Sequence, residues 1–171
     1  GLKLFPLLAN RPAFLANRRY IDKDLNRCFK KSDLRNRQLV KRVEDRRAKE
    51  IARFAKKNNI DFAIDLHTTT SNMGPTVIFT EFSEFERGLA LYLQQQIKEI
   101  SILWDPASQQ ENVFLPGIAP RCVTIEVGPV PQGVYKKSVI DWSRRVLLEI
   151  LVYCHDWNHG APVGLSKLFV Y

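Results

Sequence analysis

Strand-like and helix-like stretches alternate along this 171-residue chain, and the alternation limits the folds that it can adopt. Apolar residues recur at every second position in some segments and every three or four positions in others, the periods of strands and helices. We expect strands at 3–10, 60–67, 76–81, 101–104 and 121–128, and helices at about 34–58, 83–100 and 138–158. Ser83 with Glu86 predicts a capping box for the second helix, and Ser138 with Asp141 predicts the start of the third, which Gly160 can stop. The tail, 161–171, also resembles a strand. This order of strands and helices predicts an α/β fold with helices flanking a mixed, mostly parallel sheet.

The composition argues against a membrane-spanning, secreted or disulfide-rich protein. No apolar run reaches the roughly 18 residues that a membrane span needs, and the best, 146–154, is interrupted by Glu149. The first residues lack the arrangement of a secretory signal. Three cysteines, Cys28, Cys122 and Cys154, form no CxxC pair. They indicate reduced thiols in a cytoplasmic protein rather than a disulfide framework or a thiolate zinc site.

The chain is basic, with a formal net charge of +8, and much of the charge lies in residues 35–57, which carry ten Lys and Arg against three Asp and Glu. Apolar positions there recur at helical spacing, so the charges fall on the outer face of a helix. A solvated helix face is the favoured interpretation, and a non-enzymatic nucleic-acid-binding module is the alternative. Because the stretch lacks aromatic platforms, nucleic acid is not the expected partner.

The segment DFAIDLHTTTSNMGPT (61–76) ends a strand-like run in an acid and a histidine. Asp65 and His67 are two residues apart, so they share one face of an extended chain where the strand leaves the core. His67 is a candidate metal ligand with Asp65 holding its second ring nitrogen, and a hydrogen-bonded core histidine is the alternative. One histidine alone does not make a zinc site, which needs about three protein ligands.

Two further segments carry polar groups that suit chemistry. Glu126 ends the apolar run in TIEVGP (124–129), where a carboxyl group suits general acid–base work; a salt-bridged structural glutamate is the alternative. The segment RRYIDKDLNR (18–27) holds arginines that can grip a carboxylate or stabilise an oxyanion, although a surface turn with local ion pairs has the same composition. His155 and His159 have the spacing of a helical zinc pair but lie where a helix ends, so a contact with the helix C-terminus is expected instead.

In this order, NRRYIDKDLNR (17–27), DLHTTTSNMG (65–74) and TIEVGPVPQG (124–133) resemble the aspartoacylase branch of the aspartoacylase and succinylglutamate desuccinylase family of zinc amidohydrolases. The resemblance runs from about residue 2 to residue 158. It implies a carboxypeptidase-like zinc hydrolase core followed by a smaller β-rich domain, with one Zn²⁺ per subunit. The implied reaction is hydrolysis of an N-acyl amino acid, N-acetyl-L-aspartate first, with N-acyl aromatic amino acids or succinylglutamate as alternatives.

The resemblance also implies roles for particular residues. His67 would be the third zinc ligand, and Glu126 would take a proton from the zinc-bound water and pass it to the leaving amine. Arg19 would polarise the scissile carbonyl, while Asn26 and Arg27 would hold a carboxylate of the substrate. The side chains expected to support these groups are Asp24, Asp65 and Thr68.

Three departures from the family pattern bear on these roles. The other two zinc ligands belong to a His-x-x-Glu motif that this sequence lacks, and we expect it upstream of Gly1. Thr68 stands where relatives often carry Asn. Pro116 stands where some carry a substrate-binding arginine, and Arg121 is not an aligned substitute.

The expected organisation is a catalytic domain over 1–160, without its first strand, and the start of a β-rich domain or linker over 161–171. We expect the 171 residues alone to bind zinc weakly, to be inactive and to aggregate. The expected partner is a small anionic N-acyl amino acid, without a membrane, and a homo-oligomer is left open.

Overall fold

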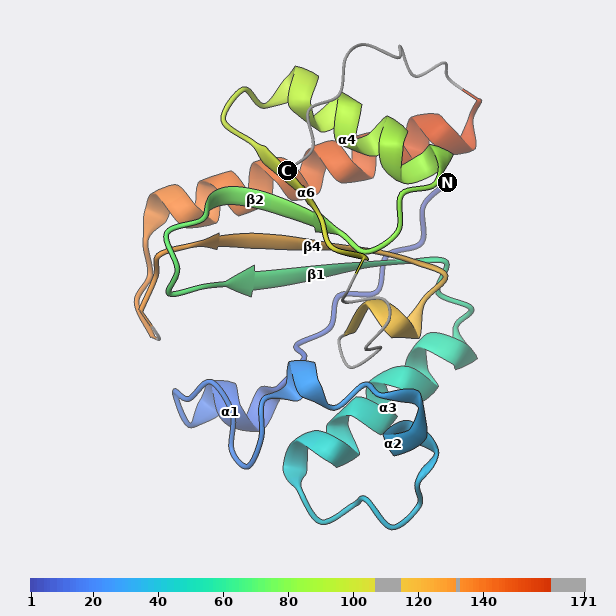
Figure 1. Cartoon of the computed structure of the whole chain (residues 1–171), viewed down its shortest axis with the longest axis vertical. Coiled ribbons are helices and arrows are strands. Elements are labelled where there is room, and N and C mark those ends of the chain that lie inside the picture. The colour runs from blue at the N-terminus through green and yellow to red at the C-terminus, as the bar shows by residue number, and fades with distance from the viewer. Residues whose placement is uncertain (107–114, 132, 161–171) are drawn as a thin grey trace. The chain divides into compact units, whose positions relative to one another are not determined.

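The computed structural model describes residues 1–106, 115–131 and 133–160, and Figure 1 shows their helices and strands. The elements in chain order are α1 (Arg11–Leu15), η1 (Leu25–Arg27), α2 (Lys31–Arg35), α3 (Val43–Lys57), β1 (Phe62–Thr68), β2 (Gly74–Phe79), α4 (Glu84–Gln96), β3 (Ser101–Trp104), η2 (Leu115–Ile118), β4 (Arg121–Gly128) and α6 (Lys137–Asn158). The strands predicted over 60–67, 76–81, 101–104 and 121–128 are all present, and each end lies within two residues of its predicted position.

The four strands form one sheet in the order β1-β4-β2-β3. β2 and β3 are parallel, with Thr76 opposite Ser101 and Phe79 opposite Trp104. The arrows of β1 and β4 also point in the same direction in Figure 1. Because β4 follows β3 in the chain but lies between β1 and β2, the sheet is not a simple meander, as expected of an α/β fold.

The chain divides into two compact units. The first contains 1–5, 66–105 and 124–171, and the second contains 6–65 and 106–123. Each is described separately below.

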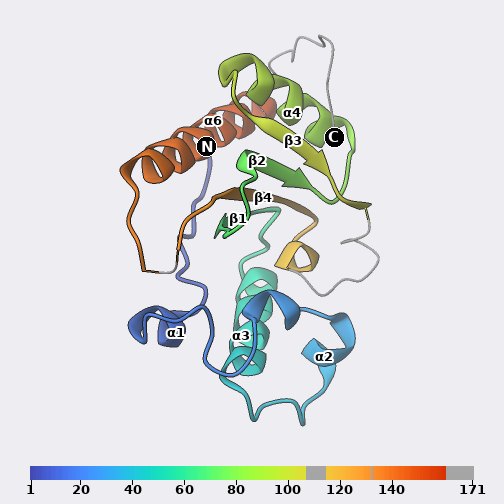
Figure 2. The same cartoon turned by 60° about the vertical axis from the view of Figure 1, so that its left-hand side comes forward.

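In the first unit, α4 and α6 pack against each other, and α4 also contacts β3; Figure 2 shows the two helices side by side. The predicted capping box of α4 is present, since Ser83 and Glu86 satisfy each other's backbone donors. The buried hydroxyl of Tyr153 on α6 donates to the backbone oxygen of Phe85 on α4, at 3.1 Å. This bond lets a large aromatic ring fill the core without leaving its polar end unsatisfied.

The second unit has its own apolar core. It comprises Leu25 of η1, Cys28 and Phe29 directly after η1, and Ala48 and Ile51 on the buried face of α3. Helical spacing of the apolar residues on α3 places them on the buried face and most of its Lys and Arg side chains outside, as the sequence predicts. Its two first-turn acids, Glu44 and Asp45, are buried instead.

The structure corrects three predictions of secondary structure. Residues 3–10 form no strand and instead precede α1, which Asn10 caps and Pro12 starts. The helix predicted over 34–58 is split into α2 and α3, because Asn36 at the end of α2 is extended. α6 begins at Lys137 without the side-chain cap predicted at Ser138.

Other predictions are confirmed or lie outside the described residues. Gly160 follows the end of α6 with a φ of 70°, a conformation that suits glycine as a helix stop. The strand predicted in the tail lies among 161–171, which are not described. None of the helices in the described part of the chain is sufficiently long and apolar for a membrane span.

Candidate active site

The end of β1 and the end of β4 lie side by side within the first unit. The Thr69 amide donates to the Val127 carbonyl at 3.0 Å, and the Val130 amide donates to the Thr69 carbonyl at 3.0 Å. In a parallel ladder, a residue donates to the position before its partner and accepts from the position after it, so the bond to Val127 places Thr69 opposite Gly128. The Arg121 amide, which donates to the Asp61 carbonyl at 3.2 Å, gives the same register at the other end of the two strands. The bond from Val130 is one position out of this register, because Pro129 has no N–H to donate. Two residues before Thr69, the register of Thr69 and Gly128 pairs His67 with Glu126 on one face of the sheet.

Gly128 makes this close approach of the two strands possible. A Cβ added there would lie 2.4 Å from the Thr69 carbonyl oxygen, 2.6 Å from the Thr69 methyl carbon and 2.7 Å from the Ser71 carbonyl oxygen. All three distances are far below van der Waals contact. The absence of a side chain at this position therefore allows the hydroxyl-rich loop after His67 to lie directly against β4.

Burial along the two strands separates a core face from the face with the polar residues. Val123, Ile125 and Val127 of β4 are buried, whereas Glu126 between them is only half-buried. Glu126 therefore does not lie in the apolar interior, although its neighbours in the sequence do. On β1, Asp65 is buried and His67 is half-buried, so the polar face opens toward the strand end.

The segment 18–27 lies in the second unit and is organised by local bonds. Arg19 Nε and Nη2 donate to Asp24 Oδ2 at 3.3 and 3.0 Å, and the other oxygen of Asp24 accepts from the Asn26 amide at 3.0 Å. Asn26 Oδ1 accepts from the Leu115 amide at 3.0 Å, which orients the amide nitrogen of the side chain away from that contact. Arg27 is exposed and donates to the Asn26 carbonyl at 3.0 Å.

Of the local ion pairs that the surface-turn alternative predicts, the structure shows the one between Arg19 and Asp24. The structure brings His67 and Glu126 together in one unit. It assigns Arg19, Asn26 and Arg27 to the other.

Glu44 on α3 is a site-supporting residue that the sequence analysis did not identify. It is 0% exposed, and its carboxylate accepts from the amides of Ile21 at 2.6 Å, Asp22 at 3.1 Å and Lys23 at 3.2 Å, and from Asn10 Nδ2 at 3.0 Å. Burial by itself raises the pKa of this carboxyl, but the hydrogen bonds outweigh burial and lower the pKa. An acid in the first turn of a basic helix is the signal in the sequence that could have identified Glu44. The groups that donate hydrogen bonds to it are 21 to 34 residues away in the sequence, so the sequence does not identify them.

The three cysteines lie in buried positions. Cys28, Cys122 and Cys154 are free. Burial raises the pKa of Cys28 to about 11, and burial together with the charge of Asp65 raises the pKa of Cys122 further. Both thiols therefore stay protonated near neutral pH.

The donor set near His67 fits a zinc ion only in part. Its imidazole is a suitable ligand at a strand end, but the described residues hold no group of three or more His, Cys, Asp and Glu side chains that could bind a metal. His155 and His159 are both exposed; His159 Nδ1 is 2.7 Å from the His155 carbonyl oxygen, and His155 Nδ1 is 3.1 Å from Asp156 Oδ1. These histidines bond within the last turn of α6, as predicted.

Comparisons with known proteins identify the family of this chain. The family model described as the succinylglutamate desuccinylase/aspartoacylase catalytic domain matches residues 1–154. The chain belongs to this family. It is 37% identical over 163 residues to a probable aspartoacylase of Acaryochloris marina, an alignment that covers 94% of this chain and 55% of the relative. It is 34% identical over 174 residues to a human N-acyl-aromatic-L-amino acid amidohydrolase (carboxylate-forming), with 97% and 54% covered.

A solved structure supports the fold. The crystal structure of murine aminoacylase 3 superposes with a TM-score of 0.81 at 30% identity, over 90% of this chain and 53% of the murine chain. The α/β, carboxypeptidase-like fold predicted from the sequence is therefore confirmed. The chain spans about half the length of the relatives that it matches.

Proposed function

We propose that the protein hydrolyses the amide bond of an N-acyl amino acid, with N-acetyl-L-aspartate as the first substrate and acetate and L-aspartate as products. The observation that carries this proposal is the register of β1 and β4, which pairs an imidazole with a carboxylate at adjacent strand ends. Membership of a family named for aspartoacylase and succinylglutamate desuccinylase supports the same chemistry.

In the proposed reaction, Glu126 is the proton carrier. Its carboxylate is half-buried at the strand end, so it can reach both a water molecule and a substrate. It accepts a proton from the attacking water and later donates that proton to the leaving amine. Arg19 polarises the scissile carbonyl, and Asn26 with Arg27 binds the substrate carboxylate through charge-assisted hydrogen bonds.

We further propose that the complete site uses one zinc ion, with His67 as a ligand and the other ligands in a His-x-x-Glu segment upstream of Gly1. A zinc ion supplies Lewis-acid assistance and lowers the pKa of a water molecule. Because the described residues provide one ligand of the expected set, we derive no step through the metal. Residues 1–160 would form the catalytic domain, and 161–171 would begin a second, β-rich domain or a linker.

N-acyl aromatic amino acids are the second candidate substrates. The human relative carries that activity in its name, and Pro116 stands in this chain where some family members carry a carboxylate-binding arginine. An apolar side chain on the substrate would not require that arginine. Succinylglutamate remains the third candidate, from the name of the family.

Glu126→Gln is the deciding variant, tested in the longer protein that contains the His-x-x-Glu segment. We expect turnover of N-acetyl-L-aspartate to fall by about 10²–10⁴-fold, because a glutamine cannot carry the proton. Zinc content should not change, since Glu126 is not proposed as a ligand. The assay is release of the free amino acid from N-acetyl-aspartate, N-acetyl-tyrosine and N-succinylglutamate, with metal analysis of the same sample.

The matched control is Glu99→Gln, which makes the same chemical change at an exposed position of the same unit. It should leave turnover and zinc content unchanged. Near-normal turnover of Glu126→Gln would remove Glu126 from the mechanism. A loss of zinc together with turnover would make Glu126 a ligand instead. No cleavage of any of the three substrates by the wild-type protein would reject the proposed function.

A further inference from the structure

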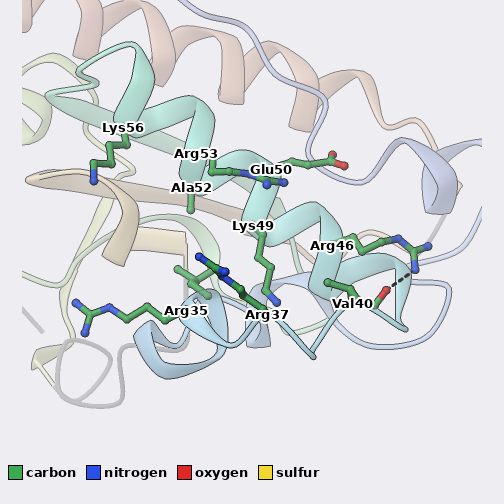
Figure 3. Close-up of a pocket in the computed structure, with 10 residues that line it drawn as sticks. Arg35, Arg37, Val40, Arg46, Lys49, Glu50, Ala52, Arg53 and Lys56 are labelled. Carbon is green, nitrogen blue, oxygen red and sulfur yellow. Dashed lines mark hydrogen bonds between the residues drawn. The ribbon is translucent and has the colours of Figure 1, made fainter.

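A basic pocket lies in the second unit, between α3, α2 and the segment that joins them. It is a cavity of about 690 Å³, and six of its lining residues are cations: Arg35, Arg37, Arg46, Lys49, Arg53 and Lys56. Figure 3 shows Lys49 extending from α3 toward the segment that carries Arg37. The proposed amide hydrolysis uses none of these side chains.

The cations of α3 share one face of the helix. Arg46, Lys49, Arg53 and Lys56 are separated by three, four and three residues, which is the spacing of neighbours on a helix surface. Like charges at this spacing repel one another and destabilise a helix, so the arrangement costs free energy when the pocket is empty. A bound anion would remove that cost.

Two of the cations form the frame of the pocket. Arg46 Nη1 donates to the carbonyls of Val40 and Lys41 at 2.7 and 2.8 Å, and the ammonium of Lys49 donates to those of Asn36 and Leu39. These bonds tie the segment between α2 and α3 to the helix. The pocket is therefore built by the fold and is not a collection of independent surface side chains.

The remaining four cations are available to a ligand. In the part of the chain that the structure describes, the side chains of Arg35, Arg37, Arg53 and Lys56 make no hydrogen bond or ion pair, and all four residues are exposed. Glu50 also lines the pocket, but its carboxylate accepts from Arg47 at 3.1 Å. Three guanidinium groups and one ammonium group thus face a cavity with little opposing charge.

We propose that the basic pocket binds a compact, multiply charged phosphate anion, such as an oligophosphate. Guanidinium groups present paired donors that match phosphate or carboxylate oxygens, and the number of cations around one cavity favours a multiply charged phosphate over a single carboxylate. The lining residues include no aromatic side chain on which a base could stack, so the phosphates and not a nucleobase would be recognised. The cavity is concave and local, which favours a small anion over an extended nucleic acid.

The test is a calorimetric titration of the longer protein that contains the His-x-x-Glu segment with inorganic tripolyphosphate, and then with ATP and with adenosine. We expect one site per chain for tripolyphosphate, similar binding of ATP and none of adenosine. The variant Arg37→Gln/Arg53→Gln should weaken tripolyphosphate binding by about tenfold or more, because two charge-assisted contacts are lost. The control Lys98→Gln/Arg144→Gln removes the same charge from exposed positions of the other unit.

The control should change the dissociation constant by less than about twofold, since neither residue lines the pocket and exposed charges outside it are screened at physiological salt. Equal weakening by both double variants would overturn the proposal, because the binding would then follow net charge alone. Binding of adenosine would also overturn it. Tighter binding of generic duplex DNA than of tripolyphosphate, with a steep salt dependence, would assign the surface to nucleic acid instead. Thermal unfolding of each variant checks that the second unit stays folded.

Discussion

At the scale of single residues, Glu44 organises the candidate substrate-binding segment from outside that segment. Its buried carboxylate accepts three consecutive backbone amides, those of Ile21, Asp22 and Lys23. An ionised carboxylate gains more from such bonds than a neutral acceptor does, and leaving the amides buried without a partner is costly. One side chain of α3 therefore holds the loop that carries Arg19 and Arg27.

Glu44→Gln is expected to lower the free energy of unfolding by roughly 1–3 kcal/mol at neutral pH, because charged hydrogen bonds are replaced by weaker ones and the two donors that face the new amide nitrogen lose their acceptor. The pKa of Glu44 is lower in the folded state than its usual value of 4.5. Its stabilisation is therefore complete above about pH 4.5 and is lost as the pH falls through the folded pKa. Urea unfolding at several pH values measures both effects.

The control for this prediction is Glu50→Gln on the same helix, where the carboxylate is exposed and pairs with Arg47. We expect a change within about 0.5 kcal/mol. The difference between wild type and Glu44→Gln should shrink toward acidic pH. A constant difference down to pH 3 would mean that the charge of Glu44 does not provide the stabilisation.

At the scale of elements, the relation of β1 to β4 depends on a residue without a side chain. Gly128 lets the loop after His67 pack against β4, and two backbone hydrogen bonds through Thr69 fix that contact. As a result, β1 and β4 hold His67 and Glu126 opposite each other. Backbone atoms of one element cannot move away from a new Cβ as a flexible side chain can, so the position tolerates little change.

Gly128→Ala is expected to destabilise the chain by roughly 1–3 kcal/mol, as overpacking at a rigid contact does. The Thr69 amide should also lose protection from hydrogen exchange, because the loop must move to admit the methyl group. Thr124→Ala, four residues earlier on the same face of β4, inserts no atom and should keep that protection. Unchanged stability and exchange in Gly128→Ala would show that the loop yields without cost.

At the scale of the whole molecule, the described residues contain one candidate ligand of the proposed zinc site. His67 lies at the end of an edge strand of the sheet, and the described residues contain no cluster of three metal-binding side chains. A stable catalytic zinc site draws on about three protein ligands. The missing donors must come from residues beyond those described if the proposed function is correct.

We therefore expect the 171-residue chain alone to show no stoichiometric zinc binding at micromolar concentration and no deacylase activity. Addition of the upstream His-x-x-Glu segment should restore zinc binding and activity together, and His67→Ala should abolish the restored binding. Calorimetric zinc titration and an N-acetyl-aspartate assay measure the two properties. Tight binding by the 171 residues alone would mean that other residues, for example His155 or His159, complete a site.

The sequence determined the strands, the family and the candidate residues, because these depend on local order. The alternation in β4 and the capping box of α4 involve neighbours in the chain, so periodicity and spacing were enough to predict them. The same local rules failed at residues 3–10, where apolar side chains suggested a strand but the backbone has no strand partner among the described residues.

Only the tertiary structure decided which distant residues meet. Glu44 accepts hydrogen bonds from amides more than 20 positions away, and Gly128 contacts a loop almost 60 positions away. Arg46 and Lys49 close the basic pocket because they donate hydrogen bonds to carbonyls of the segment before α3. Such contacts follow from the path of the backbone between elements. No local pattern of polarity encodes that path, so the residues that hold the candidate site and frame the pocket could be recognised only once the chain was folded.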